Sequence, residues 1–405
     1  MPPSSQISTV GSPVSKKVQA LQVSGESSFS RMLRLASHIP QLISLGRGDP
    51  DVPTPAHIVE ASIAALQSRH INYTPPAGLP ELRTAIAAKL KTENGLEYDP
   101  ATEIIVTTGA QEAISVIMQT LLDPGDEVLL PDPYYTVYEM AIGLSGGMVV
   151  HVPTAAERDF EVLAADIAAR ITSRTRLVVL VSPNNPTGGI ISAATLAKIA
   201  EVVQQHNLVV ISDELYEKII FDGADSPSIA RLPGMRQRTL IINGFSKAYC
   251  MTGFRVGYLA GPAALVQAML EPHHTLNICA PTISQRAALA ALQGNQECVA
   301  EIVDIFAKRR RVLLDSLTGV GIPYPHPSGA FFAFADIRAT GMTSADFAVK
   351  VLNEAGVLVF PGTQYGPGGE GFLRISYLAE IPAIEQAVEK LGQVYRSAII
   401  EKENK

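Results

Sequence analysis

A lysine follows a short apolar stretch in the middle of the chain, and its position suggests amine chemistry. Residues 239–242 (TLII) are apolar and of strand length, and Lys247 comes five residues later. A lysine so close to the end of a core strand is seldom structural, because lysine is among the residues least often buried. Burial would lower the pKa of its amine and make it a candidate nucleophile.

Carboxylate, phenol and amide side chains follow two further apolar stretches. Asp213 and Tyr216 come just after residues 208–211 (LVVI). The turn at 182–189 (SPNNPTGG) comes after residues 177–181 (LVVLV). A carboxylate at the end of a buried strand needs a cationic or protonated partner. Proline and glycine alone explain a tight turn at 182–189, but two consecutive asparagines after a buried strand also favour a binding role.

A candidate anion site follows another strand-like stretch, residues 103–107 (EIIVT). Residues 108–111 (TGAQ) open the helical pattern that comes next. The first backbone N–H groups of a helix are unpaired and attract anions. For this motif alone, capping of the helix by Thr108 is the simpler interpretation. Arg255, eight residues after the lysine, adds a cation suited to phosphate.

Together these residues would bring an amine, a carboxylate, a phenol, an amide, an anion site and a guanidinium to one sheet edge. Pyridoxal phosphate chemistry needs such a set. A lysine forms a Schiff base with the aldehyde, and a carboxylate keeps the pyridine nitrogen protonated so that the ring can accept electrons. A helix terminus and an arginine bind the phosphate.

The elements that would position these residues form an α/β pattern. From about residue 100 onward, strand-like stretches that are apolar on every side alternate with helical patterns. This is typical of a mainly parallel sheet covered by helices on both faces. Ligands of such sheets bind at the carboxyl ends of the strands, where the polar residues stand here. We assign residues 56–294 to this large domain.

The two ends of the chain are expected to form a smaller α+β domain. Beyond about residue 281 long helical patterns are separated by short strands, and an apolar strand at 41–45 precedes the main sheet. We therefore assign residues 26–55 and 295–405 to the small domain. Residues 1–25 are rich in Ser, Pro and Gln and are predicted to be a mobile tail.

Composition excludes several classes of protein. The 405 residues are 47% hydrophobic and 18% charged, with a net charge of −7, which argues against a general nucleic-acid binder. No apolar run reaches the length of a membrane span. Three cysteines, far apart and without a CxxC pair, make a disulfide framework improbable and favour a reducing, cytoplasmic location.

Four motifs carry a family resemblance over about residues 28–397. They are SPNNPTG (182–188), DELY (213–216), FSKAYCMTGFRVGY (245–258) and GEGFLRISY (369–377). In this order and spacing the chain resembles a class I/II aminotransferase, a fold-type-I pyridoxal phosphate enzyme of the aspartate aminotransferase superfamily. The resemblance implies a seven-stranded sheet in the large domain, a homodimer, and ping-pong transfer of an amino group between an L-amino acid and a 2-oxo acid.

The resemblance also implies roles for individual residues. Lys247, Asp213 and Tyr216 would form the catalytic set, with Lys247 as the Schiff-base lysine and proton carrier and Asp213 at the pyridinium nitrogen. Arg374 would bind the substrate α-carboxylate. Cofactor contacts are implied for Gly109, Ala110, Gln111, Tyr135, Asn185, Tyr216, Ser246 and Arg255, with Tyr73 reaching the phosphate of the neighbouring subunit; Gly48, Asn185 and Tyr135 would also face the substrate.

Two departures from the family pattern stand out. Gly244 stands where many members have Ser or Thr, which leaves the phosphate site poorer in hydrogen-bond donors. Gln111 is neutral near the place where related bacterial enzymes carry a lysine that reads a second carboxylate of the substrate. Neutral or aromatic amino acids are therefore favoured as donors. Acidic donors stay open through Arg47 or flexible use of Arg374, although a surface ion pair is the preferred interpretation of Arg47.

Competing functions share part of this pattern. β-Lyases acting on cystathionine-like substrates and 1-aminocyclopropane-1-carboxylate synthases share the same lysine, aspartate and arginine. A non-catalytic amino-acid sensor is less favoured, because these residues are all present and only about 25 residues precede the resemblance. A nicotinamide dehydrogenase lacks its GxGxxG motif. No metal site is expected, since there is no HExxH and His273 and His274 are adjacent.

Overall fold

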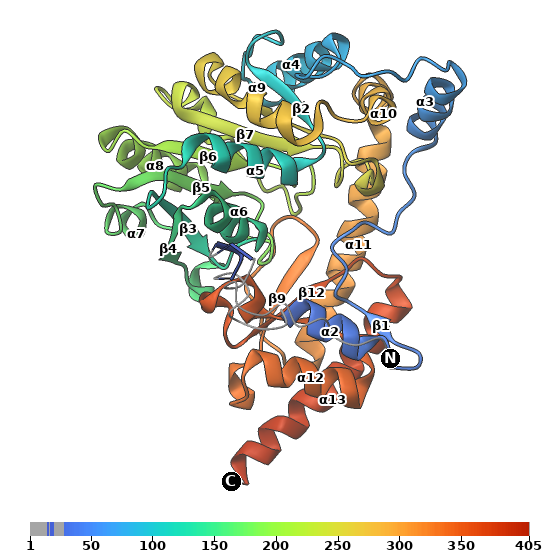
Figure 1. The fold of residues 1–405 in the computed structure, drawn as a ribbon. Coiled ribbons are helices and arrows are strands. Elements are labelled where there is room, and N and C mark those ends of the chain that lie inside the picture. The colour runs from blue at the N-terminus through green and yellow to red at the C-terminus, as the bar shows by residue number, and fades with distance from the viewer. Residues whose placement is uncertain (1–13, 16, 20–27, 405) are drawn as a thin grey trace, which may run out of the picture.

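The computed structural model describes residues 14, 15, 17–19 and 28–404. The predicted mobile tail, residues 1–25, lies almost entirely outside the described residues. Within the described part, seven strands form the main sheet in the order β2-β8-β7-β6-β5-β3-β4 (Figure 1). Their bounds are β2 Ile104–Thr107, β3 Glu127–Asp132, β4 Met148–Pro153, β5 Thr175–Val181, β6 Val209–Asp213, β7 Thr239–Gly244 and β8 Gly257–Ala260.

Helices cover both faces of this sheet, because successive side chains of a strand point to opposite sides. In β5, Leu177 and Val179 pack into the same core as α5, α6 and α9. Val178 and Leu180 pack into the core that contains α7 and α8. The helices of this part are α3 Ala56–Gln67, α4 Pro80–Asn94, α5 Ala110–Leu121, α6 Val137–Ser145, α7 Ala164–Ala168, α8 Ala193–Gln205, α9 Ala263–Asn277 and α10 Thr282–Gln293.

A smaller part is built from both ends of the described chain. Near the N-terminus, β1 (Ile43–Ser44) pairs in parallel with β10 (Val357–Leu358). A separate antiparallel sheet has the order β11-β12-β9. In Figure 1, α2 lies beside α12, and the long helix α11 runs from the main sheet into this part. The remaining bounds are α2 Ser28–Ala36, β9 Phe332–Asp336, β11 Phe360–Pro361, β12 Phe372–Ser376, α11 Glu297–Val320, α12 Ser344–Ala355 and α13 Ile381–Glu403.

The α/β fold with a mainly parallel sheet and a smaller second part is confirmed. One strand of the sheet was missed: β8 is antiparallel to both of its neighbours, β7 and β2. It is only four residues long, GYLA, and begins with glycine, so it does not stand out as a strand in the sequence. The boundaries of the two domains stay a prediction. None of the described helices combines the length and the apolar character that a membrane span requires.

The 182–189 turn packs tightly against the smaller part, and this leads to a stability prediction. Gly188 has φ +73°, and a Cβ there would lie 2.6 Å from Pro327 Cβ and 2.8 Å from the Phe332 carbonyl oxygen. Gly188→Ala should lower the free energy of unfolding by about 2–4 kcal/mol, through overpacking and backbone strain. Denaturant unfolding measures the change.

A matched variant separates strain from crowding. Gly125 also has positive φ, +92°, but a Cβ there meets no atom within 4 Å. Gly125→Ala should therefore cost only about 1 kcal/mol. Equal losses in the two variants would show that crowding against the smaller part contributes nothing.

Candidate active site

The Lys247 amine lies in the turn that follows β7 and contacts the N-terminal segment. Its Nζ donates a hydrogen bond of 2.6 Å to the carbonyl oxygen of Gly48, 199 residues earlier in the chain. The amine also lies 5.8 Å from the ring centroid of Tyr216 and 5.5 Å from that of Phe331. The apolar stretch of β7 therefore ends beside a buried amine, as its sequence position predicted, and aromatic rings form part of its surroundings.

The surroundings of this amine lower its pKa. Burial lowers the pKa of Lys247 to about 8, with smaller contributions in the same direction from Arg374 and Arg255. The carboxylates of Asp49 and Asp213 act in the opposite direction. A pKa near neutrality suits an amine that must both accept and release a proton.

Asp213 is the last residue of β6 and is buried beside the lysine's strand. The Tyr138 hydroxyl donates a 2.8 Å hydrogen bond to its Oδ2, and the backbone N–H of Leu215 donates to its Oδ1 at 3.2 Å. Burial raises the pKa of Asp213 to about 6, although these two hydrogen bonds and the nearby Lys247 oppose the rise. The carboxylate is thus held ready to accept a further donor or cation.

Arg374 projects from β12 of the smaller sheet and meets the main sheet's turn. Its Nη1 donates to Asn185 Oδ1 at 3.3 Å, and its Nη2 donates to the Gly46 carbonyl oxygen at 2.8 Å. The guanidinium lies 4.4 Å from the ring centroid of Phe332 and 4.8 Å from that of Tyr365. Its Nε is buried and has no hydrogen-bond partner. A buried N–H of this kind is costly unless an acceptor binds there.

The candidate anion site is formed by the N-terminus of α5 and by Arg255. Gly109 is the N-cap residue, with φ +81°, and no side chain caps the helix. A Cβ on Gly109 would lie 2.7 Å from Arg255 Nη2, so the guanidinium stands directly beside this turn. Capping by Thr108, the simpler interpretation of the motif, is wrong. Ala110 and Gln111 form the first turn of the helix, and Ser246 is buried next to the lysine.

Two tyrosines complete the described surroundings of the site. Tyr216 is buried, with its ring edge-on to Phe331 at 5.2 Å. Burial raises the pKa of Tyr135, and Asp213 raises it further, whereas Arg255 and Arg374 lower it. Tyr135 is therefore within electrostatic reach of all three charged groups, as expected of a residue that faces the site.

The structure of the single chain does not bring Tyr73 to the site. Its side chain is 79% exposed, in the loop between α3 and α4. Gly48 faces open space, since a Cβ there would meet no atom within 4 Å. Arg47 is exposed and pairs with Asp49 at 3.0 Å, in agreement with the surface ion pair expected for it.

Sequence reasoning missed Tyr138 as a partner of Asp213. Tyr138 is fully buried on α6, three residues after Tyr135. Tyr135 precedes α6, which begins at Val137, so the spacing of the tyrosines in PYYTVY does not indicate which of them meets the strand ends. The sequence also did not predict that the carbonyl oxygens of Gly46 and Gly48 accept hydrogen bonds from Arg374 and Lys247. A sequence motif does not reveal which side chain a carbonyl oxygen meets.

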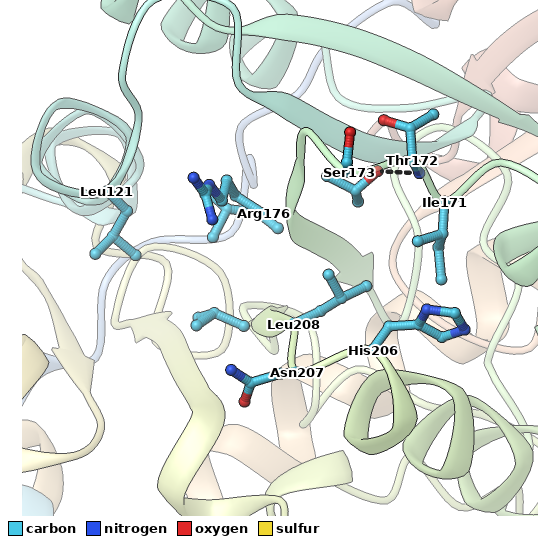
Figure 2. A pocket seen from close by; sticks show the side chains of 11 residues that line it. Leu121, Ile171, Thr172, Ser173, Arg176, His206, Asn207 and Leu208 are labelled. Atoms are coloured by element: carbon cyan, nitrogen blue, oxygen red, sulfur yellow. Dashed lines mark hydrogen bonds between the residues drawn. The ribbon is translucent and has the colours of Figure 1, made fainter.

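A hollow of about 670 Å³ lies at the opposite ends of the strands from the candidate site. Figure 2 shows its lining, which includes Ile171, Arg176, His206, Asn207 and Leu208. These residues precede β5 and β6 or begin them, whereas Asp213 ends β6. The hollow is thus at the amino ends of the strands and is separate from the candidate site.

Comparison with known proteins identifies the class of this fold and site. The family described as "Aminotransferase class I and II" matches residues 40–391. Aromatic-amino-acid aminotransferase 2 of Thermococcus litoralis is 37% identical, and an aspartate aminotransferase of Pyrococcus abyssi is 39% identical, each over 93% of this chain and 97% of the relative. The aromatic aminotransferase structure from Pyrococcus horikoshii has a TM-score of 0.87 and 40% identity over 90% of this chain and 99% of its own.

The chain therefore belongs to the class I and II aminotransferases. It is an enzyme that transfers amino groups, and its fold is that of the fold-type-I members of the superfamily. The resemblance drawn from the four sequence motifs is confirmed.

The hydrogen bond from Tyr138 to Asp213 generates a pH prediction. Tyr138→Phe removes a donor that stabilises the ionised carboxylate, so the pKa of Asp213 should rise from about 6. A carboxylate is ionised above its pKa, so activity that needs the ionised form should be lost at a higher pH. We expect the acidic limb of the kcat profile to move upward by about one to two pH units.

Tyr134→Phe is the matched control. The Tyr134 hydroxyl donates to Glu139 at 2.7 Å, and the ring stacks on His151, away from Asp213. Its acidic limb should stay in place. An unshifted limb in Tyr138→Phe would show that the phenol does not govern the carboxylate.

Proposed function

We propose that this aminotransferase is a pyridoxal phosphate enzyme that exchanges an amino group between an L-amino acid and a 2-oxo acid by a ping-pong mechanism. One observation carries the proposal. The buried amine of Lys247, with a pKa lowered to about 8, lies within electrostatic reach of both Asp213 and Arg374. A proton-carrying amine, a carboxylate and a carboxylate-binding guanidinium are the groups that this chemistry requires.

The described residues fit the cofactor. The uncapped N-terminus of α5, at Gly109, Ala110 and Gln111, offers backbone N–H groups to a phosphate, and Arg255 stands beside it. Ser246 would supply a hydroxyl. In the same assignment Asp213 would pair with the protonated ring nitrogen, Tyr216 and Asn185 would donate to the phenolic oxygen, and Tyr135 would stack on the ring.

When bound, pyridoxal phosphate supplies an aldehyde that takes up the amino group and a ring that accepts an electron pair. The chain's own residues do the rest. Lys247 Nζ would take the proton that leaves the α-carbon of the amino donor in the first half-reaction and would supply the proton that is added to the oxo-acid carbon in the second. The Asp213 carboxylate, at the end of β6, would stabilise the positive charge of the protonated ring nitrogen. Tyr138 keeps that carboxylate ionised and oriented through its 2.8 Å hydrogen bond.

Arg374 would bind the α-carboxylate of the substrate. Its Nε has no partner, and its Nη1 bond to Asn185 is long at 3.3 Å, so two N–H groups are available for a carboxylate. The aromatic rings of Phe332 and Tyr365 fix the guanidinium plane. Gly48 leaves room for the substrate beside its backbone, and Asn185 and Tyr135 border the same space.

We propose a cytoplasmic homodimer in which Tyr73 of the partner subunit reaches the phosphate. Exposed apolar side chains support a subunit interface around the loop that carries Tyr73. Val59, Ile63 and Leu66 form an exposed stripe on α3, and Ile71, Leu276 and Ile278 are exposed as well. A group of exposed apolar residues of this kind is typical of a protein interface.

The substrate side chain is proposed to be neutral or aromatic. A second substrate carboxylate would need a second cation, and Arg47, the candidate for that role, is bonded to Asp49 at 3.0 Å. Phe332, Phe360 and Tyr365 surround Arg374 with aromatic surface. This environment favours an apolar side chain over a charged one.

Replacement of the lysine tests the assignment of the cofactor. Lys247→Ala should lose the yellow colour of the holoenzyme that borohydride bleaches, and transamination should fall by about 10³-fold or more because the proton carrier is gone. Lys350→Ala, a change on α12 with an ion pair to Glu401, should keep both properties. If Lys247→Ala kept both the yellow colour and the turnover, the assignment of Lys247 would be wrong.

Replacement of Asp213 tests its proposed role at the ring nitrogen. Asp213→Asn should retain bound cofactor but lose most turnover, because the amide carries no negative charge. Absorbance of the bound cofactor and the transamination rate measure the two properties.

A half-reaction screen tests the substrate. Mixing the holoenzyme with single amino acids and following loss of the yellow colour should give rates for phenylalanine and leucine at least roughly tenfold above that for aspartate. Arg47→Ala should leave the phenylalanine rate unchanged. A faster rate for aspartate that disappears in Arg47→Ala would instead assign Arg47 to a second carboxylate.

A further inference from the structure

A fully buried histidine bridges two segments of the proposed active site. His273, on α9, places Nδ1 2.8 Å from Glu112 Oε1 and Nε2 2.9 Å from the carbonyl oxygen of Pro76. Its side chain has no exposed surface, and that of Glu112 is almost as deeply buried. Sequence analysis singled out this histidine only to reject it as a metal ligand, and the proposed reaction makes no use of it.

The hydrogen bonds of this histidine require a shared proton. A carbonyl oxygen only accepts, so Nε2 must carry hydrogen toward Pro76. A second proton then lies between Nδ1 and Glu112 Oε1, whichever of the two groups holds it. Burial raises the pKa of Glu112, but hydrogen bonds from His273 and from the Thr108 N–H outweigh it, and the net pKa is lowered. The pair is therefore buried and shares one proton, and it is hydrogen-bonded at both ends.

Glu112 connects the pair to the phosphate site. Its Oε2 accepts the backbone N–H of Thr108, the residue before Gly109, and Glu112 itself lies in the first turn of α5. The carboxylate thus fixes the turn whose N–H groups are proposed to bind the phosphate. A shift of this turn on phosphate binding would be transmitted to the imidazole ring.

Pro76 connects the pair to the loop that carries Tyr73. The inner side of this loop is anchored: Gln285 donates to Thr74 Oγ1 at 2.9 Å and accepts the Leu79 N–H at 2.7 Å. Its outer side presents Tyr73, 79% exposed. The bond to Pro76, three residues from Tyr73, links this loop to the phosphate turn of the same subunit through the side chains of His273 and Glu112.

We propose that Thr108, Glu112, His273 and Pro76 form a link that couples cofactor binding in one subunit to subunit association. The inference rests on the proposed homodimer and cofactor. Phosphate bound at α5 orders the Thr108 turn, and the link then holds the loop in the position from which Tyr73 reaches the partner subunit. Coupling of this kind is reciprocal, so association also favours cofactor binding. His273 is a positioning residue in this arrangement.

The ratio of two dimer dissociation constants measures the link. Analytical ultracentrifugation of the full chain, without and with pyridoxal phosphate, gives Kd for each state. In the wild type the cofactor should lower Kd by a factor of about 5–150, the usual range of coupling between sites. His273→Gln keeps a donor for Pro76, and His273→Asn keeps one for Glu112, so each breaks the link at one bond. Both should reduce the ratio by about fivefold or more.

Two further variants separate the link from general damage. Glu112→Gln can accept from Thr108 and donate to Nδ1, so it should retain the wild-type ratio, whereas Glu112→Ala should lower it as the histidine variants do. Gln285→Ala loosens the same loop from α10. It should therefore weaken the dimer equally without and with pyridoxal phosphate, and leave the ratio of the two Kd values unchanged. Thermal unfolding checks that each variant is folded.

The outcomes distinguish the link from the proposed function. A wild-type ratio retained in His273→Gln, His273→Asn and Glu112→Ala would overturn the link, because a direct contact between Tyr73 and phosphate would then explain all of the coupling. Loss of the ratio in Gln285→Ala as well would also overturn it, by showing that any loosening of the loop suffices. A chain that bound no pyridoxal phosphate, or never dimerised, would overturn the proposed function itself.

Discussion

The hydrogen bond from Lys247 to the Gly48 carbonyl oxygen is the contact on which the site depends. It joins the end of β7 to a segment near the N-terminus, 199 residues away in sequence. The same segment is held from the other side, since the Ser376 N–H donates to the Leu45 carbonyl oxygen and Arg374 donates to that of Gly46. One short segment that follows β1, residues 45–48, thus fixes the distance between the amine of the main sheet and the guanidinium of the smaller one.

Much of this arrangement follows from local sequence. Apolar stretches that are buried on both faces must become central strands, and the polar residues after them must gather at one edge of a parallel sheet. For this reason the sequence alone predicts that Asp213 and Lys247 lie at the same edge of the sheet. Asn185 could be placed at the same edge, since its turn follows another central strand. The motif around Arg374 added the cation, although nothing local to that motif tells which sheet will carry it.

The remaining features depend on contacts between distant segments. β8 is short and contains glycine, and it becomes a strand only because β2 and β7 pair with it on both sides. Tyr138 meets Asp213 only after α6 has packed on the sheet, and the carbonyl oxygens of Gly46 and Gly48 find their donors only when both ends of the chain meet. The interface around Tyr73 goes further, because its residues are exposed in one chain and acquire a role only in a second copy.

The charges of the site constrain one another. Burial lowers the pKa of Lys247 most, and Arg374 and Arg255 lower it further; the two arginines are also the groups best suited to bind anions. An anion at either guanidinium offsets its positive charge, so the repulsion that lowers the pKa of the amine weakens as the site fills. Asp49 and Asp213 act in the opposite direction and keep the amine from losing its proton too easily. Because the pKa of Lys247 lies near 8 and that of Asp213 near 6, modest changes in these neighbours are sufficient to move a proton at neutral pH.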